Sequence, residues 1–388
     1  MALKTSLLLS TLPLVLGTTY PLIESWSGSG FMDGFRYPAS FYDNTTNGDV
    51  FWATAANTSL IYTSSSGTTI LKVDNTSYVP YNEKRYAPKI LSKTEYQPGT
   101  VWVFDAVHMP YGCSVWPAVW TQGPDWPEHG EIDIMEGINQ QTTNQVALHT
   151  AGSGCLASSS SSLSGGTLTY DNCSIGAHYD SGCTTNMTNA DTYGSGFAAA
   201  GGGVYVAEFA TDGIRIWFFT RSSVPSSFGV SSKSIDTSSL GTPAAEYLSS
   251  SCNITEYFSS QIFTIDITLC GDWAGIAANL EETCPQLQGD NTCYTTYVIN
   301  NASTTYANAY FEINYLNVYS TSTSGSSSSG SSASGASSTI TAGVSPTSGS
   351  SSKTSGAASP VAIPSLSHGK ISLAGVVVAG LLAGFSLL

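Results

Sequence analysis

Three carboxylates fall within one short apolar stretch, at the end of the segment WPAVWTQGPDWPEHGEIDIMEG of residues 116–137. Glu131 and Asp133 are two positions apart, so in a β-strand their side chains point to the same face. Glu136 would ordinarily point to the other face. A β-bulge, one extra residue at Ile134–Met135, would return it. The spacing therefore predicts a bulged strand that gathers Glu131, Asp133 and Glu136 on one surface.

Like charges beside isoleucine and methionine are unfavourable, because desolvation and repulsion raise the pKa of at least one carboxyl group. Such a site can keep one carboxyl protonated as an acid and another ionised as a nucleophile. A solvent-facing acidic edge and a calcium site are the two other interpretations. The apolar neighbours argue against an exposed edge, and calcium usually draws on more scattered oxygen ligands. We therefore expect catalysis, with no metal ion and no cofactor.

Tryptophans accompany these carboxylates. Trp116, Trp120 and Trp126 all lie within 15 residues upstream of Glu131. Indole faces stack on the apolar faces of pyranose rings, so tryptophans beside paired carboxylates are typical of a carbohydrate cleft. A single tryptophan is more often part of the core, and we expect this of one of the three. If the stretch is extended, Trp116, Ala118 and Trp120 share a face.

The elements that must position these residues are strands. Residues 204–210 and 214–219 flank Thr211-Asp212-Gly213, which is a hairpin signature. Residues 100–107, 144–149 and 311–319 are similarly rich in β-branched and aromatic side chains. Sustained helical periodicity is hard to find, and Gly, Pro, Asn and Ser interrupt the chain at short intervals. The pattern predicts an all-β fold, an antiparallel β-sandwich.

Both ends of the chain predict export. Residues 1–18 carry Lys4 and then a short apolar run, as in a secretory signal peptide. The uncharged run 371–388 follows a polar spacer and the small residues 356–358, as in a GPI-attachment signal; the alternative is a tail-anchoring helix. We expect residues 359–388 to be removed and the mature protein to be anchored by GPI to the plasma membrane at the cell surface. Transfer to the cell wall is a further expected fate.

Between these signals lie a domain and a stalk. Residues 321–358 consist mainly of Ser, Gly, Thr and Ala, with Lys353 as the one charge, which predicts a flexible, O-glycosylated stalk. Residues 19–320 are then one globular domain. It contains all eight cysteines, which in a secreted protein predict up to four disulfides, and 105 pairings are open. The cysteines lack the CxxC spacing of a zinc or redox site.

Seven Asn-x-Ser/Thr sequons also agree with a secreted surface, and each permits N-glycosylation. They begin at Asn44, Asn57, Asn75, Asn172, Asn186, Asn253 and Asn301. The chain has 27 acidic against 12 basic residues, a formal net charge of −15. This excess repels nucleic acid and anionic membrane surfaces. It suits a neutral partner such as a sugar polymer.

One string carries a family resemblance. GEIDIMEG, preceded by HMPYGCSVWPAVWTQGPDWP and followed by NQVALHT, resembles fungal laminarinase-like enzymes of glycoside hydrolase family 16. The match runs from about Tyr20, through CGDWAG at residues 270–275, to the stretch near Tyr319. The resemblance implies a curved β-jelly-roll sandwich with a concave substrate cleft. It also implies an endo-1,3(4)-β-glucanase, which hydrolyses β-1,3- or mixed β-1,3/1,4-glucans with retention.

The resemblance also assigns roles. Glu131 takes the position of the nucleophile and Glu136 that of the acid/base, and Asp133 between them orients and tunes both. The sugar-binding positions that it implies are Trp116, Trp120, Trp126, His149 and Trp273. Many relatives carry an R-x-S-x-R segment where residues 85–89 read RYAPK. A lysine in place of the second arginine can donate a hydrogen bond, but not through a bidentate fork.

Two other functions stay open at this point. A wall-remodelling transglycosylase would pass the glycosyl group to a sugar instead of water, and a GPI anchor favours it. Against it, the cell-wall transglycosylases of this superfamily typically lack the extra residue, here Met135. A non-catalytic glucan-binding wall protein is the other alternative, but both glutamates are present. We expect a monomer that binds β-glucan, and the preferred linkage stays open.

Overall fold

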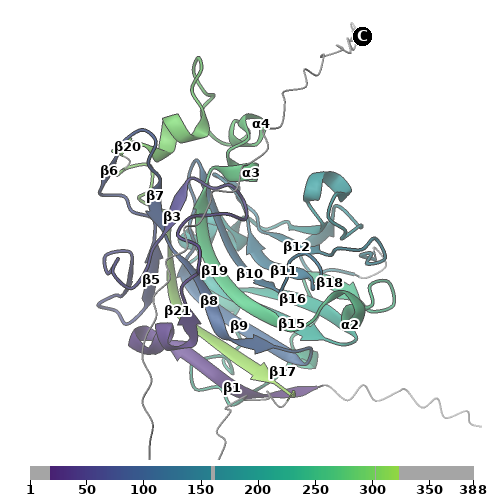
Figure 1. The fold of residues 1–388 in the computed structure, drawn as a ribbon. Helices are drawn as coiled ribbons and strands as arrows, with labels where there is room; N and C mark the ends of the chain where they lie inside the picture. The colour runs from purple at the N-terminus through teal and green to yellow at the C-terminus, as the bar shows by residue number, and fades with distance from the viewer. Residues whose placement is uncertain (1–17, 159–161, 302, 323–388) are drawn as a thin grey trace, which may run out of the picture. The chain divides into compact units, whose positions relative to one another are not determined.

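Figure 1 shows the computed structural model, which describes residues 18–158, 162–301 and 303–322. The predicted signal peptide, stalk and GPI-attachment signal lie outside the described residues, apart from residues 18, 321 and 322. None of the helices in these ranges has the length and apolar character needed to cross a lipid bilayer.

Two antiparallel sheets form the body of the domain. The first has eight strands in the order β13-β14-β12-β11-β10-β19-β8-β2. Its strands are β2 (Phe35–Arg36), β8 (Lys89–Tyr96), β10 (Val115–Gln122), β11 (Glu131–Glu136), β12 (Gln145–His149), β13 (Gly166–Leu168), β14 (Cys183–Met187) and β19 (Gln261–Leu269). The candidate carboxylates therefore lie on a strand in the middle of this sheet.

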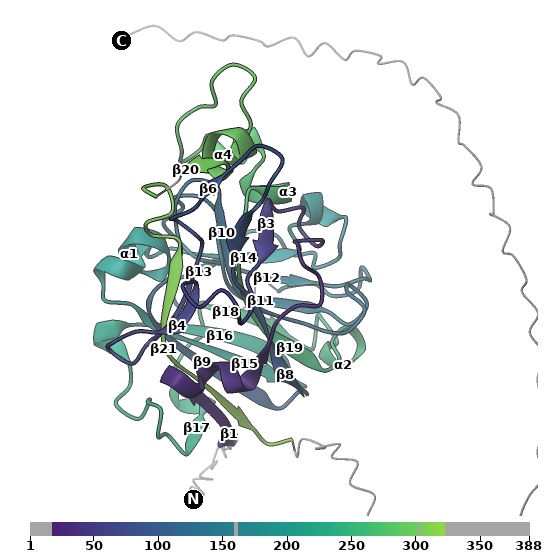
Figure 2. The same ribbon diagram turned by 60° about the vertical axis from the view of Figure 1, so that its left-hand side comes forward.

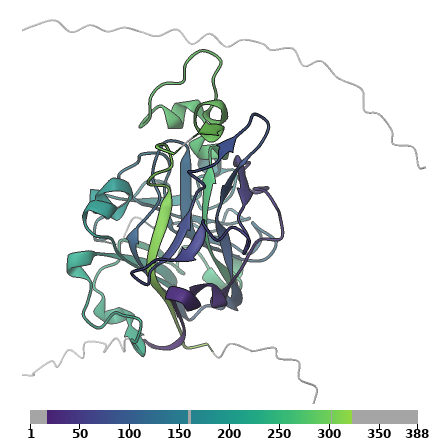
Figure 3. The same cartoon turned by 90° about the vertical axis from the view of Figure 1, so that its left-hand side faces the viewer.

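The second sheet has nine strands, seven of them in the order β17-β1-β21-β9-β15-β16-β18, and β5 and β4 extend it from β21. Its strands are β1 (Thr19–Ser27), β4 (Ile61–Thr63), β5 (Thr69–Lys72), β9 (Thr100–His108), β15 (Gly203–Ala210), β16 (Gly213–Thr220), β17 (Ser234–Asp236), β18 (Ala245–Leu248) and β21 (Tyr310–Ser320). In Figures 2 and 3 the yellow-green strand β21 runs beside blue strands from the first third of the chain. The end of the domain is thus tied to its beginning.

Short elements complete the fold. Strand β3 (Val50–Trp52) pairs with β7 (Arg85–Ala87), and β6 (Tyr78–Val79) pairs with β20 (Asn300–Asn301). The helices are α1 (Gly194–Ala199), α2 (Ile254–Tyr257), α3 (Gly271–Ala274) and α4 (Ala277–Leu280). The 3₁₀ turns are η1 (Gly28–Gly34), η2 (Ala177–Asp180), η3 (Ala190–Thr192), η4 (Arg221–Ser223) and η5 (Thr237–Ser239), and η6 (Tyr294–Val298) is a π-turn.

The predicted antiparallel sandwich is confirmed. The predicted hairpin is β15 and β16, whose register pairs Ala210 with Gly213 across the turn Thr211-Asp212. The other three predicted strands are β9, β12 and β21, each within one residue of its expected bounds. The parallel pair β3–β7 was not predicted, because its two short strands lie far apart in the sequence.

The main core lies between the two sheets. Val119, Ile132 and Leu148 of the eight-stranded sheet and Phe104 and Phe209 of the other belong to one buried apolar cluster. Each fully buried side chain of this size stabilises the fold by about 1.5–3 kcal/mol. Since neighbours along a strand point to opposite sides, residues that alternate with this core face outward from the sandwich. The candidate site residues are among them.

Four disulfides pair all eight cysteines, as predicted. They are Cys113–Cys284, Cys155–Cys252, Cys173–Cys183 and Cys270–Cys293. Two of them attach the segment that carries α3, α4 and η6 to residues beside β10 and β19. This segment holds Trp273 at one end of the eight-stranded sheet.

Candidate active site

The register of β11 contains the predicted bulge. Asp133 and Met135 lie opposite consecutive residues of β10, so Ile134 between them has no partner on that strand. The register against β12 shifts over the same interval. The predicted extra residue at Ile134–Met135 is therefore confirmed.

The bulge brings Glu136 to the face of the other two carboxylates. Asp133 lies opposite Trp120 and Glu136 lies opposite Ala118. Trp120 and Ala118 are two positions apart on β10, so they share a face and so do the carboxylates opposite them. Without the extra residue, Glu136 would point into the core.

Asn144 supports the bulge, and sequence reasoning did not identify it as a functional residue. Its side chain is fully buried. Its Oδ1 accepts a hydrogen bond from the backbone N–H of Glu136 at 2.8 Å, and its Nδ2 donates to the carbonyl oxygen of Ile134 at 3.1 Å. These bonds satisfy backbone groups that the irregular ladder leaves free. The available signal was that the predicted strand 144–149 begins with a polar residue, Asn144.

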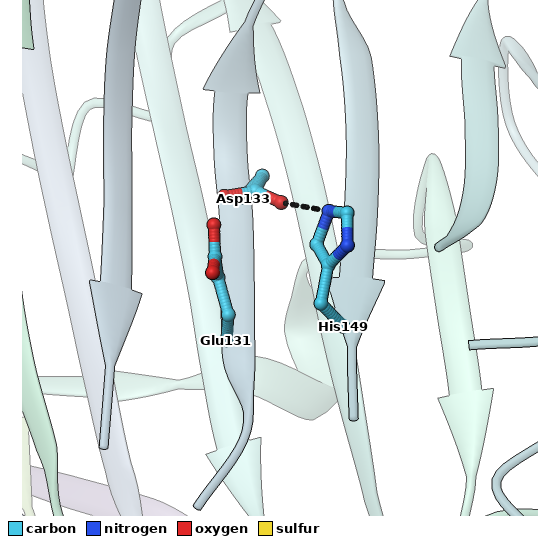
Figure 4. Close-up of side chains that lie close together, drawn as sticks. All are labelled: Glu131, Asp133 and His149. Carbon is cyan, nitrogen blue, oxygen red and sulfur yellow. Dashed lines mark ion pairs between the residues drawn. The ribbon is translucent and has the colours of Figure 1, made fainter. Parts of the chain in front are cut away.

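Figure 4 shows Glu131 and Asp133 on β11 close to His149 on β12. His149 lies opposite Glu131, and its Nε2 is 3.2 Å from Oδ2 of Asp133. This is an ion-pair distance but not a hydrogen-bond geometry, and none of the described residues donates a hydrogen bond to Oδ2 of Asp133. One ligand atom from each residue lies within 4.8 Å of the others. Two carboxylates and an imidazole could also hold a divalent cation.

Two indole N–H groups point at the two glutamates. Trp126 Nε1 donates to Oε2 of Glu131, and Trp116 Nε1 donates to Oε1 of Glu136 at 2.8 Å. The Trp116 ring meets Trp273 of α3 edge to face, with 5.4 Å between ring centroids. The fold therefore brings together Trp116, Trp126, His149 and Trp273 from separate elements around the carboxylates. Their contact with sugar stays a prediction.

Trp120 differs from the other tryptophans. Only 9% of its surface is exposed, against 50% for Trp126. Its Nε1 donates to Oδ1 of Asp266 at 3.2 Å, and the Lys89 ammonium lies 5.1 Å from its ring centroid. Trp120 is thus the tryptophan that belongs largely to the floor of the site. Its predicted sugar contact is not tested by this arrangement.

A buried ion pair lies beside this floor. Lys89 Nζ is 3.4 Å from Oδ2 of Asp266, and both residues are buried. The sequence analysis did not predict Asp266 as a site residue, although it is the one carboxylate in the apolar strand β19. Arg85 is also fully buried, and it donates to backbone carbonyls, including those of Val298 and Asn300. Arg85 therefore stabilises the fold, while Lys89 reaches the site.

The carboxylates raise one another's pKa. Burial, and next the charge of Asp133, raise the pKa of Glu131 to about 8. Burial raises the pKa of Glu136 to about 7, and the charges of Glu131 and Asp266 act in the same direction. Burial and the charge of Glu136 hold the pKa of Asp133 well above its ordinary range. The cluster therefore retains protons near neutral pH, and the roles of nucleophile and acid/base stay a prediction.

These raised pKa values predict a pH-dependent stability. When the pKa of a carboxyl group is higher in the folded than in the unfolded state, its contribution to stability is fully present at a pH below the unfolded-state pKa. That contribution is lost as the pH rises through the folded-state pKa. For Glu131 the window runs from the ordinary value of 4.5 to about 8. We expect the Tm to fall between pH 5 and pH 8.5, and Glu131→Gln to reduce that fall.

Thermal unfolding at both pH values measures the effect. Glu128→Gln is the matched control, because it removes the same charge from an exposed position three residues away. A Glu131→Gln protein that loses as much stability as the wild type over this range would show that Glu131 ionises freely in the fold.

The seven sequon asparagines are all at least partly exposed residues. Asn44, Asn253 and Asn301 are exposed, and the other four are half-buried. Each asparagine is therefore accessible to some degree, and glycosylation at these positions stays a prediction.

Comparison with known proteins places this geometry among carbohydrate-active domains. A family model described as "XgeA-like, catalytic GH16 domain" matches residues 35–319. A protein of Neosartorya fischeri named "Probable endo-1,3(4)-beta-glucanase" is 41% identical over 310 residues, which are 78% of this chain and 46% of that protein. The chain thus spans about half the length of that relative.

Two solved structures are similar throughout their length. Laminarinase 16A of Phanerochaete chrysosporium, with β-glucans in donor and acceptor sites, is 36% identical and has a TM-score of 0.71. An "elongating GH family 16 beta-1,3-glucosyltransferase" is 37% identical with a TM-score of 0.70. Each comparison covers 78% of this chain and 100% of the other.

Proposed function

The chain belongs to glycoside hydrolase family 16, and from this premise we propose that it is a retaining endo-hydrolase of β-1,3- or mixed β-1,3/1,4-glucans. The bulge in β11 is the observation that carries the proposal, because it turns Glu131, Asp133 and Glu136 to one face. Two glutamates that flank a scissile bond are the usual machinery of glycoside hydrolysis.

The reaction takes two steps. Glu131 attacks the anomeric carbon while Glu136 protonates the departing glycosidic oxygen, so that a glycosyl-enzyme ester forms and the leaving sugar departs as an alcohol. Glu136, now ionised, removes a proton from water, and the hydroxide so formed displaces Glu131. Each step inverts the anomeric carbon, and together they retain it. Asp133 lies between the two, and it orients and tunes both side chains.

The direct test uses laminarin and barley-type mixed-linkage glucan as separate substrates. We expect oligosaccharides of several lengths from internal cleavage, with the β-anomer formed first, as followed by NMR. Linkage analysis of the products then gives the preferred bond. Release of α-anomers, or no release from either glucan, would contradict the proposal.

Transfer to sugar is the second candidate, because one similar structure is titled as an elongating glucosyltransferase. The same glycosyl-enzyme serves both reactions, and the difference lies in whether water or a sugar hydroxyl attacks it. Incubation with labelled oligosaccharide acceptors separates them. Labelled products longer than the acceptor indicate transfer, whereas unchanged acceptor and shorter glucans indicate hydrolysis.

The proposed reaction uses no metal ion, which makes a further prediction. Dialysis against EDTA should leave kcat and KM unchanged, because Glu131 supplies the nucleophile and Glu136 supplies the acid and the base. A loss that added Ca²⁺ or Mg²⁺ restores would instead mean that Glu131, Asp133 and His149 hold a cation. Activity before and after dialysis is the measurement.

Exposure distinguishes the expected effects of two tryptophans. Trp126→Ala should weaken glucan binding with little change in Tm, because half of its surface is exposed beside Glu131. Trp120→Ala should lower the stability of the fold by about 3 kcal/mol or more, because it empties a buried site. Thermal unfolding and glucan affinity, measured on both variants, check this. Equal loss of stability in the two would contradict the assignment of Trp126 to the cleft wall.

We also propose that the protein is exported and anchored by GPI, and that it acts as a monomer. The pairing of all eight cysteines supports an oxidising compartment. The end segments supply the expected signals. Release of the protein from intact cells by a phosphatidylinositol-specific phospholipase tests the anchor, and light scattering of the released protein tests its oligomeric state.

A further inference from the structure

A polar hollow lies beside the active site, on the side of β12 and β14. Its volume is about 250 Å³. All of its lining side chains are amides or hydroxyls, among them Gln141, Gln145, Asn186 and Thr283. Such groups can both donate and accept hydrogen bonds and carry no charge. The hollow is therefore suited to a neutral ligand rich in hydroxyl groups.

Strand register places this hollow in line with the acid/base residue. Glu136 lies opposite Gln145 of β12, and Gln145 lies opposite Asn186 of β14. Residues opposite one another share a face of the sheet. Since neighbouring strands are about 4.8 Å apart, Asn186 lies roughly 10 Å from Glu136 across the sheet. A glucan that crosses the strands at Glu136 would reach Gln145 and then Asn186.

One wall of the hollow is held in place before any ligand binds. Gln140 donates from Nε2 to the carbonyl oxygen of Thr283 at 3.0 Å, and its backbone N–H donates to Thr283 Oγ1 at 3.2 Å. The next residue after Thr283, Cys284, is bonded to Cys113 by a disulfide. A preformed wall lowers the entropy lost when a ligand binds.

Asn186 also begins a sequon, with Thr188 as its hydroxyl residue. Asn186 lines the hollow, and its Nδ2, the atom that would carry a glycan, donates to Thr169 Oγ1 at 3.1 Å. We propose that the hollow binds a sugar residue of the substrate, and that an N-glycan on Asn186 occupies the same space and shortens the cleft. This inference rests on the proposed function.

The modification itself is ordinary secretory chemistry. An oligosaccharide passes from a lipid pyrophosphate donor to Nδ2 of Asn186, which loses a proton, and the lipid pyrophosphate leaves. The first sugar is then covalently fixed two strands from Glu136. It competes with a long glucan for the amides of the hollow, but not with a substrate too short to reach them.

The experiment uses the full chain secreted from a glycosylating host. Peptide mass spectrometry first measures the occupancy of Asn186. Thr188→Ala removes the sequon and keeps Asn186, whereas Thr188→Ser keeps both. We expect Thr188→Ala to lower the KM for long laminarin chains about fivefold, the value of roughly one hydrogen bond, and Thr188→Ser to match the wild type. KM for the shortest oligosaccharide that is hydrolysed should not change.

Two further variants complete the test. Thr255→Ala makes the same substitution in the exposed sequon at Asn253 and should leave every KM unchanged. Adding Gln145→Leu to Thr188→Ala should raise the KM for long chains again, about fivefold. An unmodified Asn186, or a KM that is indifferent to Thr188→Ala, overturns the inference. Absence of hydrolysis in the wild type and all variants would instead reject the proposed function.

Discussion

Glu131→Ala should lower kcat/KM on laminarin by at least about 10⁴-fold, because it removes the carboxylate that forms the glycosyl-enzyme. The carboxylate lies at the start of the strand, with the Trp126 indole N–H at one oxygen and His149 opposite on β12. Steady-state rates on laminarin measure the loss. The fold should survive, since the substitution removes a carboxyl group whose ionisation is unfavourable there.

The control for this prediction is Glu128→Ala, which removes an exposed carboxylate three residues away and should leave the rate unchanged. Azide offers a second readout. In the cavity left by Glu131→Ala, azide can displace the leaving sugar in one step and give an inverted glycosyl azide. A Glu131→Ala enzyme that keeps activity within tenfold of the wild type would remove Glu131 from the nucleophile role.

Glu136→Ala should affect substrates according to their leaving groups. Hydrolysis of glucans should fall about 10²- to 10⁴-fold, because a sugar hydroxyl is a poor leaving group without a proton donor. An activated aryl β-glycoside needs little protonation, so its first step should largely survive. Release of the phenol then appears as a burst, since the second step lacks the base that activates water.

Azide should restore turnover of Glu136→Ala on the aryl glycoside, because an anion attacks the glycosyl-enzyme without a base. The product should be the β-glycosyl azide, in which the configuration is retained. An inverted azide from this variant would exchange the two roles, so that Glu136 would be the nucleophile. NMR of the anomeric proton distinguishes the two products.

The sequence by itself determined the parts of the site that depend on neighbours along the chain. The strand, its side-chain alternation and the bulge follow from residues 131–136, because a period of two and one extra residue decide which side chains share a face. The sandwich followed in the same way from short β-rich segments separated by turn residues. The pairing of all cysteines followed from their even number.

Tertiary structure alone decided what joins distant parts of the chain. Asn144 supports Glu136 across a strand turn, and Lys89 reaches Asp266 over 177 positions, through strand pairings that leave no local signature. The disulfide connectivity was likewise open in the sequence, because each bond joins cysteines that only the tertiary structure brings together. Trp120 and Trp126 are alike in the sequence, yet one is buried and one is half exposed. Burial depends on what the rest of the fold packs against a side chain, so the spacing along the chain could not distinguish the two.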